Sequence, residues 1–143
     1  MDISLFLRIL TAALLGGVIG LERGYRAKEA GFRTHFLVAM GSALFMVLSA
    51  HGFDGVLVSE NHRLDVSRIA AQVVSGIGFL GAGIIFKDGD TVKGLTTAAT
   101  VWCAAAIGGL CGFGMFAEAI IGTAAIMTVN LLFKHLRHEE RHE

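Results

Sequence analysis

The last residues of the chain match a zinc-protease motif. His138 and His142 stand four residues apart with Glu139 between them, the H-E-x-x-H spacing that places two imidazoles on one helix face around Zn²⁺. His135 falls on the same side of a continued helix. A zinc hydrolase also needs a third ligand and a shaped substrate cleft, and only Glu143 follows His142 in this sequence. We therefore expect no confident metal site and no catalytic residue here.

The composition is that of a protein embedded in lipid. Apolar residues make up 54% of the chain and charged residues only 17%, with 19 glycines and no proline. The apolar residues form long runs, which is typical of membrane spans and not of soluble amphipathic helices. The formal net charge of zero gives no reason to expect nucleic-acid binding. We also find no nucleophile with a base inside the apolar runs, so we expect no enzyme.

The apolar runs predict an all-α integral membrane protein, a compact bundle of about five transmembrane helices. The stretch 95–133 would form one helix about 58 Å long, nearly twice a hydrocarbon layer of about 30 Å. It must therefore turn back, and we place the turn at its central glycines. Residues 1–133 then form one transmembrane domain and residues 134–143 a charged cytoplasmic tail. The predicted spans are 3–21, 34–52, 68–86, 95–111 and 113–133.

Lysine and arginine predict the orientation in the membrane, because loops rich in these residues stay in the cytoplasm. Five spans place nine of them on one side, in the loops 22–35 and 87–94 and in the tail. Only Arg63 and Arg68 lie on the other side. We expect the N-terminus outside and the C-terminus in the cytoplasm. The basic residues around the H-E-x-x-H match then hold the tail on the cytoplasmic side of the membrane.

Small residues recur at helical spacing in two of the predicted spans. Such spacing lets a second helix approach closely, so we expect helix packing and a homodimer. The alternative is that glycines expose backbone carbonyls along a narrow ion path. The predicted packing positions are Gly16 and Gly20 in the first span and Gly76, Gly78, Gly81 and Gly83 in the third.

Polar residues gather where the predicted spans meet the cytoplasm. The first group follows the first span, and the second flanks the loop 87–94, so both should lie at one inner membrane face. They could dock a partner, sense protons through a histidine or form the mouth of an ion path; alternatively they are helix caps and interfacial anchors, with Thr34 capping the second helix. The candidates are Glu22, Arg23, Arg33, Thr34, His35, Asp88 and Thr96.

Four residues inside the spans are further candidates. Arg8 and Glu118 lie at similar depths near the outer side, so we expect either an ion pair or two independent residues that reach the interface. Gln72 is expected to hydrogen-bond between helices. Cys103 is expected to be a free thiol, because Cys111 is too far along the same helix for a disulfide.

Two segments closely resemble the membrane domain of the MgtC/SapB family. They are "GLERGYRAKEAGFRTHFLVAMGSALF" and "RIAAQVVSGIGFLGAGIIFKDGDTVKGLTTAATVWCAAAIGGLCGFG", and the match extends from about Gly16 to Ala119. The order and spacing of these segments are those of the family. Two departures stand out. Longer members continue into a cytoplasmic regulatory domain, whereas ten residues follow Phe133 here, and many members have Asn where this chain has Thr96.

The resemblance implies a bacterial inner-membrane protein linked to magnesium limitation, acid tolerance and, in pathogens, virulence. It implies a regulator that binds membrane partners such as the F-type ATP synthase, without a resident cofactor. The alternative is a transporter or channel for magnesium or another small ion, with magnesium as the transported or sensed ion. In both cases the lipid bilayer is the first partner.

Overall fold

The computed structural model describes residues 3–53, 65 and 67–139, with side chains as far as Leu132. Arg63, Arg141 and His142 lie outside the described residues. The elements in chain order are α1 (Ile3–Tyr25), α2 (Phe32–His51), α3 (Ser67–Ile84), β1 (Phe86–Asp88), β2 (Thr91–Lys93), α4 (Leu95–Gly112) and α5 (Phe116–Glu139).

The predicted fold class, an all-α membrane protein, is confirmed. Four helices, α1 to α4, are long and apolar enough to cross a membrane. The apolar part of α5, Phe116–Leu132, is shorter, so its crossing stays a prediction. The chain turns between α4 and α5 at Phe113 to Met115, where Gly114 has a φ of +81°. The chain is therefore a multi-pass membrane protein with five helices among its described residues.

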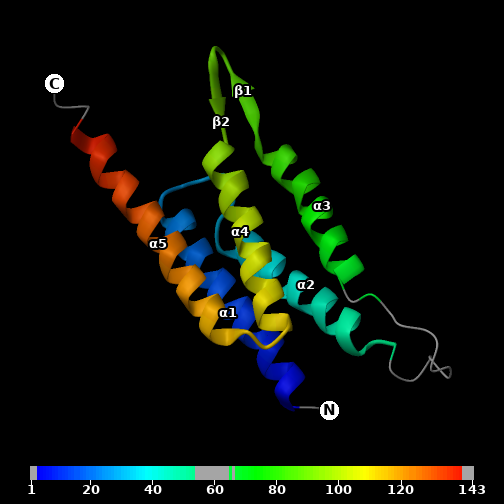
Figure 1. Cartoon of the computed structure of the whole chain (residues 1–143). Coiled ribbons are helices and arrows are strands. Elements are labelled where there is room, and N and C mark those ends of the chain that lie inside the picture. Colours follow the sequence, from blue (N-terminus) through cyan, green and yellow to red (C-terminus); the bar gives the residue numbers. More distant parts are fainter. Residues whose placement is uncertain (1–2, 54–64, 66, 140–143) are drawn as a thin grey trace.

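Three helices, α1, α2 and α4, form the packed centre of the bundle (Figure 1). α5 lies along α1 and α4, whereas α3 stands at the periphery and packs mainly on α4. The α1–α2 loop, the β1–β2 hairpin and the C-terminal end of α5 lie toward one end of the bundle, and the α4–α5 turn lies toward the other. This alternation is the one that the sequence predicts for successive spans.

Glycines let the central helices touch backbone to backbone. A Cβ added at Gly108 of α4 would lie 2.0 Å from the carbonyl oxygen of Ala39 on α2. One added at Gly16 of α1 would lie 2.5 Å from the carbonyl oxygen of His35, and one at Gly20 would lie 2.7 Å from Cα of Phe32. Real side chains do not fit at these distances, so α2 is held between α1 and α4 by close backbone contact.

The glycines of α3, which the sequence predicts as packing positions, do not make such close contacts within the chain. No described atom lies within 4 Å of a Cβ added at Gly76, Gly78 or Gly83, and at Gly81 the nearest atom, Cβ of Ala98, is 3.8 Å away. None of the described α3 residues is buried. Gly76, Gly78 and Gly83 therefore make no close contact within the described chain, and packing through them against another helix stays a prediction.

The loop between α3 and α4 contains a two-stranded hairpin that the spacing of spans did not predict. β1 pairs antiparallel with β2, with Asp88 opposite Thr91. Gly89 has a φ of +59° and is the first of two turn residues, the place that type II′ turns reserve for glycine. Asp88 also pairs with Lys93 across the hairpin.

Arg8 has a different partner from the expected one. Its Nη1 donates to the carbonyl oxygen of Gly112 at 3.0 Å, and no ion pair joins it to Glu118 in the described structure. The last carbonyls of a helix lack intrahelical partners and carry partial negative charge. Arg8 is therefore the cation that satisfies a carbonyl at the end of α4, and Glu118 stays exposed on α5.

We expect Gly108→Ala to destabilise the fold by about 3 kcal/mol or more, because the new methyl group has no room beside Ala39. Gly41→Ala serves as the matched control, since no described atom lies within 4 Å of its added Cβ. Unfolding of each variant in detergent micelles, followed by circular dichroism, measures the difference. Equal stability of the two variants would contradict the backbone contact.

Candidate functional site

A chain of hydrogen bonds joins α1, the α1–α2 loop and α4 at the end of the bundle where the hairpin lies. Nη2 of Arg23 donates to Oγ1 of Thr97 at 2.8 Å. That hydroxyl donates in turn to Oε2 of Glu29 at 2.6 Å. Arg23 is 3% exposed and Thr97 1% exposed. The Thr97 hydroxyl thus accepts a hydrogen bond from a buried guanidinium and donates one to a carboxylate at the surface.

An ion pair beside this chain ties α1 to α5. Nε of Arg26 lies 2.6 Å from Oε1 of Glu22, and Nη1 of Arg26 donates to the carbonyl oxygen of Asn130 at 3.0 Å. The Glu22 oxygens are buried and, apart from this ion pair, have no hydrogen-bond partner among the described residues. Arg26, just past the end of α1, therefore lies between a carboxylate of α1 and the backbone of α5.

His35 lies on α2, fully buried next to α1. Its Nδ1 is 2.9 Å from the carbonyl oxygen of Gly31. A carbonyl oxygen only accepts, so Nδ1 carries the proton in this contact. Nε2 of His35 and Nε of Arg23 are buried without a partner among the described residues. Buried polar atoms of this kind are uncommon and mark a place where water, an ion or a partner group binds.

Glu29 lies outside the spans, and the hydrogen-bond chain shifts the pKa of its carboxyl. The hydrogen bond from Thr97 is the main cause that lowers the pKa of the Glu29 carboxyl, helped by a backbone hydrogen bond and by Lys28 and Arg23. Burial acts in the opposite direction. The carboxylate is therefore the favoured form at neutral pH, and it accepts the Thr97 hydroxyl.

The structure brings together three of the predicted inner-face candidates, Glu22, Arg23 and His35. The other four are exposed: Arg33, Thr34, Asp88 and Thr96. Thr34 does not cap α2, because the helix begins at Phe32 with Gly31 as the N-cap residue and no side-chain cap. Asp88 lies out on the hairpin.

Sequence reasoning places Thr97 at the inner face but does not select it as a site candidate, and it misses the other residues that complete the cluster, which are Arg26, Glu29 and Asn130. The sequence shows Thr96 and Thr97 as polar residues at the start of a span, but only the structure shows that Thr97 faces Arg23. In the sequence, Arg26 contributes only a positive charge to the predicted orientation. A search for acid and base pairs at i, i+4 on the first helix would have found Glu22 and Arg26.

The candidates within the spans do not join this cluster. Gln72 is exposed on α3 and Cys103 is half-buried on α4. Both cysteines are free thiols. No group of three or more His, Cys, Asp or Glu that could hold a metal ion occurs within the described ranges. His138 and Glu139 end α5, and the rest of the H-E-x-x-H match lies outside the described residues.

The chain matches the family model described as "MgtC family" over residues 9–139. It belongs to the MgtC family. It is 54% identical over 125 residues to Protein MgtC of Brucella abortus, covering 87% of this chain and 49% of that protein. It is also 48% identical over 136 residues to the "Putative magnesium transporter YhiD" of Escherichia coli, covering 95% of this chain and 63% of that protein.

A third relative, Protein MgtC of Salmonella typhimurium, is 48% identical over 128 residues, which cover 90% of this chain and 52% of that protein. The chain thus spans about half to under two thirds of the length of these curated relatives. No solved structure matches it. The polar cluster and the packed helices lie within the region that the MgtC family model matches.

Thr97→Val is expected to lower stability by about 1–3 kcal/mol, because valine leaves the buried Arg23 Nη2 without its acceptor. Thr97→Ser keeps the hydroxyl and should stay close to the wild type. The neighbouring Thr96→Val, at an exposed position, should change stability by no more than about 0.5 kcal/mol. Unfolding in micelles ranks the three variants, and a Thr97→Ser as unstable as Thr97→Val would exclude the hydrogen-bond chain.

Glu29 should make stability depend on pH. Its folded-state pKa is lowered from the ordinary 4.5, so its contribution is present at neutral pH and is lost as the pH falls through the lowered value. We expect Glu29→Gln to have a lower Tm than the wild type at about pH 7 and to approach it as the pH falls below the ordinary glutamate pKa of 4.5 and through the lowered folded-state value. Melting curves across this range test the sign. A difference in Tm that grows on acidification would contradict it.

Proposed function

We propose that this chain is a regulatory membrane protein of magnesium homeostasis that acts during magnesium limitation and acid stress by binding membrane partners. The MgtC family membership supports the link to magnesium, since one relative is named a putative magnesium transporter. Binding, and not transport or catalysis, is its activity. The observation that carries this proposal is the bare outer face of α3.

A stripe of small residues runs along that face. Ala71, Ser75, Gly78 and Ala82 follow one another at three- and four-residue spacing and are all exposed. No described atom lies within 4 Å of a Cβ added at Gly78. In a bilayer, helices associate through such faces because their backbones can approach closely. The face is suited to α3 of a second copy or to a helix of another membrane protein.

Transport fits the central helices less well. Backbone contacts at Gly16 and Gly108 close the space between α1, α2 and α4. Charged side chains lie at the ends of the four candidate spans, and none lies at the middle of a span in the described structure. Magnesium transport remains the second candidate function, because Oε2 of the buried Glu22 carboxylate and Nε2 of His35 have no hydrogen-bond partner among the described residues and could contact a cation, although Oε1 of Glu22 is paired with Arg26.

The proposed setting is the inner membrane of a bacterium. The end of the bundle that holds the α1–α2 loop and the hairpin carries Arg26, Lys28, Arg33, Lys87 and Lys93. This excess supports a cytoplasmic location for that end, with the N-terminus outside. The proposed partners are a second copy of the chain and the F-type ATP synthase, the complex that the family resemblance suggests.

The first test separates regulation from transport. Full-length protein is reconstituted alone into liposomes that contain a magnesium-sensitive dye. We expect magnesium entry no faster than in empty liposomes. Entry well above that of empty liposomes would overturn the regulator in favour of the transporter.

The second test asks whether α3 meets α3 of another copy. Gly78→Cys on the outer face should form a disulfide-linked dimer in oxidised membranes, in a background of Cys103→Ser and Cys111→Ala. Gly76→Cys is the matched control, since it lies on the same helix toward α2 and also has open space around it. Equal cross-linking of the two variants would contradict pairing through the outer face. No cross-link at Gly78 would leave another membrane protein as the partner.

A further inference from the structure

The helices α3 and α4 are slightly shorter than the hydrocarbon layer, and the hairpin between them continues their apolar surface. Each helix has 18 residues, which is about 27 Å at about 1.5 Å per residue, against a layer of about 30 Å. In the hairpin, Phe86 and Val92 are 47% and 54% exposed. Tyr25, the last residue of α1 at the same end of the bundle, is 96% exposed, and tyrosine rings gather at the level of the lipid headgroups. The hairpin therefore begins at the boundary between the hydrocarbon layer and the headgroups.

Two basic side chains at this level have no acidic partner. Arg33 is the second residue of α2 and Lys87 is the second residue of β1, and both are exposed. Neither takes part in an ion pair within the part of the chain that the structure describes. Lysine and arginine near a membrane surface are attracted to anionic lipids. Each of the two side chains is therefore available to contact a lipid headgroup.

The acidic side chains at the hairpin end of the bundle are engaged elsewhere or lie further out. Asp88 pairs with a lysine of β2. Glu29 accepts a hydrogen bond from a hydroxyl group of α4. Asp90 lies in the turn of the hairpin, beyond both strands. Arg33 and Lys87 thus remain as two positive charges with no carboxylate bound to either in the described structure.

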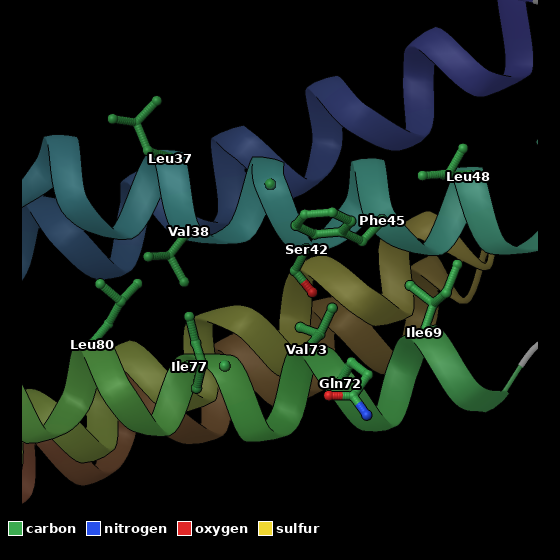
Figure 2. A pocket seen from close by; sticks show the side chains of 12 residues that line it. Leu37, Val38, Ser42, Phe45, Leu48, Ile69, Gln72, Val73, Ile77 and Leu80 are labelled. Carbon is green, nitrogen blue, oxygen red and sulfur yellow. The ribbon is translucent and has the colours of Figure 1, made fainter.

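Arg33 and Lys87 lie at the ends of two neighbouring helices. α2 begins at the hairpin end and α3 finishes there, and the two helices are in contact. Figure 2 shows Val38 of α2 facing Leu80 of α3 across a groove that both residues line. Val38 is five residues after Arg33, and Leu80 is seven residues before Lys87. Both cations therefore stand above the same pair of helices, where one headgroup can lie between them.

We propose that Arg33 and Lys87 together bind the headgroup of one anionic phospholipid at the hairpin end of the bundle. The planar guanidinium of Arg33 suits two parallel hydrogen bonds to a phosphate, and the ammonium group of Lys87 adds a compact positive charge. A lipid and not a soluble phosphate is the partner, because membrane lipids hold their phosphates at this level. The headgroup ties α3, in which no described residue is buried, to α2 of the packed centre.

The test compares two phospholipids that differ in net charge. Full-length protein in micelles of a neutral detergent is titrated with phosphatidylglycerol or with phosphatidylcholine of the same acyl chains, and binding is measured by native mass spectrometry and by the rise in Tm. We expect phosphatidylglycerol to bind about 25-fold more tightly, because each basic group near the surface contributes about a factor of five toward an anionic lipid. Raising the salt from about 50 mM to about 500 mM should reduce this preference, since salt screens exposed charges.

Three variants locate the site. Arg33→Gln and Lys87→Gln should each weaken phosphatidylglycerol binding about 5-fold, and the double variant should lose the preference for this lipid. Arg68→Gln is the matched control, because Arg68 is exposed in the first turn of α3, at the opposite end of that helix and next to Asp65. It should bind both lipids like the wild type. All three side chains are exposed, so the variants should fold, and circular dichroism verifies this.

Several outcomes would overturn the inference. Equal binding of the two lipids to the wild type would show that this end of the bundle does not select for charge. A loss in Arg68→Gln as large as that in Arg33→Gln would place the lipid elsewhere. Displacement of phosphatidylglycerol by an excess of inorganic phosphate would show a site for a soluble anion. Magnesium flux and α3 cross-linking are measured separately, so the failure of this proposal and the failure of the proposed function are distinguishable.

Discussion

The close backbone contact of α2 with α1 and α4 is the constraint on which the rest of the structure depends. Gly16 on one side and Gly108 on the other leave no room for a Cβ against the α2 backbone. In lipid there is little hydrophobic force between apolar helices, so close packing and polar contacts must hold them together. The glycine contacts supply the packing over most of the helix length, and polar contacts act at the ends.

This constraint explains why a buried arginine can exist at the end of the bundle. Because α1 and α4 both lie against α2, the start of α4 comes within hydrogen-bond distance of the end of α1, and Thr97 reaches Arg23. The bond to Glu29 extends this link to the α1–α2 loop. A charge that is costly to bury is thus bonded to a hydroxyl and lies near carboxylates. The contact of Arg8 with Gly112 has the same effect at the other end.

The sequence was sufficient for the fold class and for part of the site. Apolar runs locate helices, and charges at their ends place Glu22, Arg23 and His35 on one side of the membrane. The choice between Thr96 and Thr97 depends on how α4 is rotated, since adjacent helix residues point about 100° apart. The partner of Arg8 is a backbone carbonyl, which no side-chain pattern reveals. Glycines of α3 resemble those of α1 in spacing, yet Gly16 and Gly20 touch the backbone of α2, whereas Gly76, Gly78 and Gly83 have no described atom beside them.

The peripheral position of α3 follows from the same central packing. With α2 held closely between α1 and α4, a third neighbour of α2 cannot approach it as closely, and α3 rests mainly on α4. A groove then remains on one side of α3 and an uncovered small-residue face on the other. A helix that contributes so little to the core is free to be specialised for contacts outside it. Its two sides differ in their residues, since Gly76 lines the groove toward α2, whereas Gly78 belongs to the exposed small-residue stripe. One span can therefore make contacts on two sides without using the same residues.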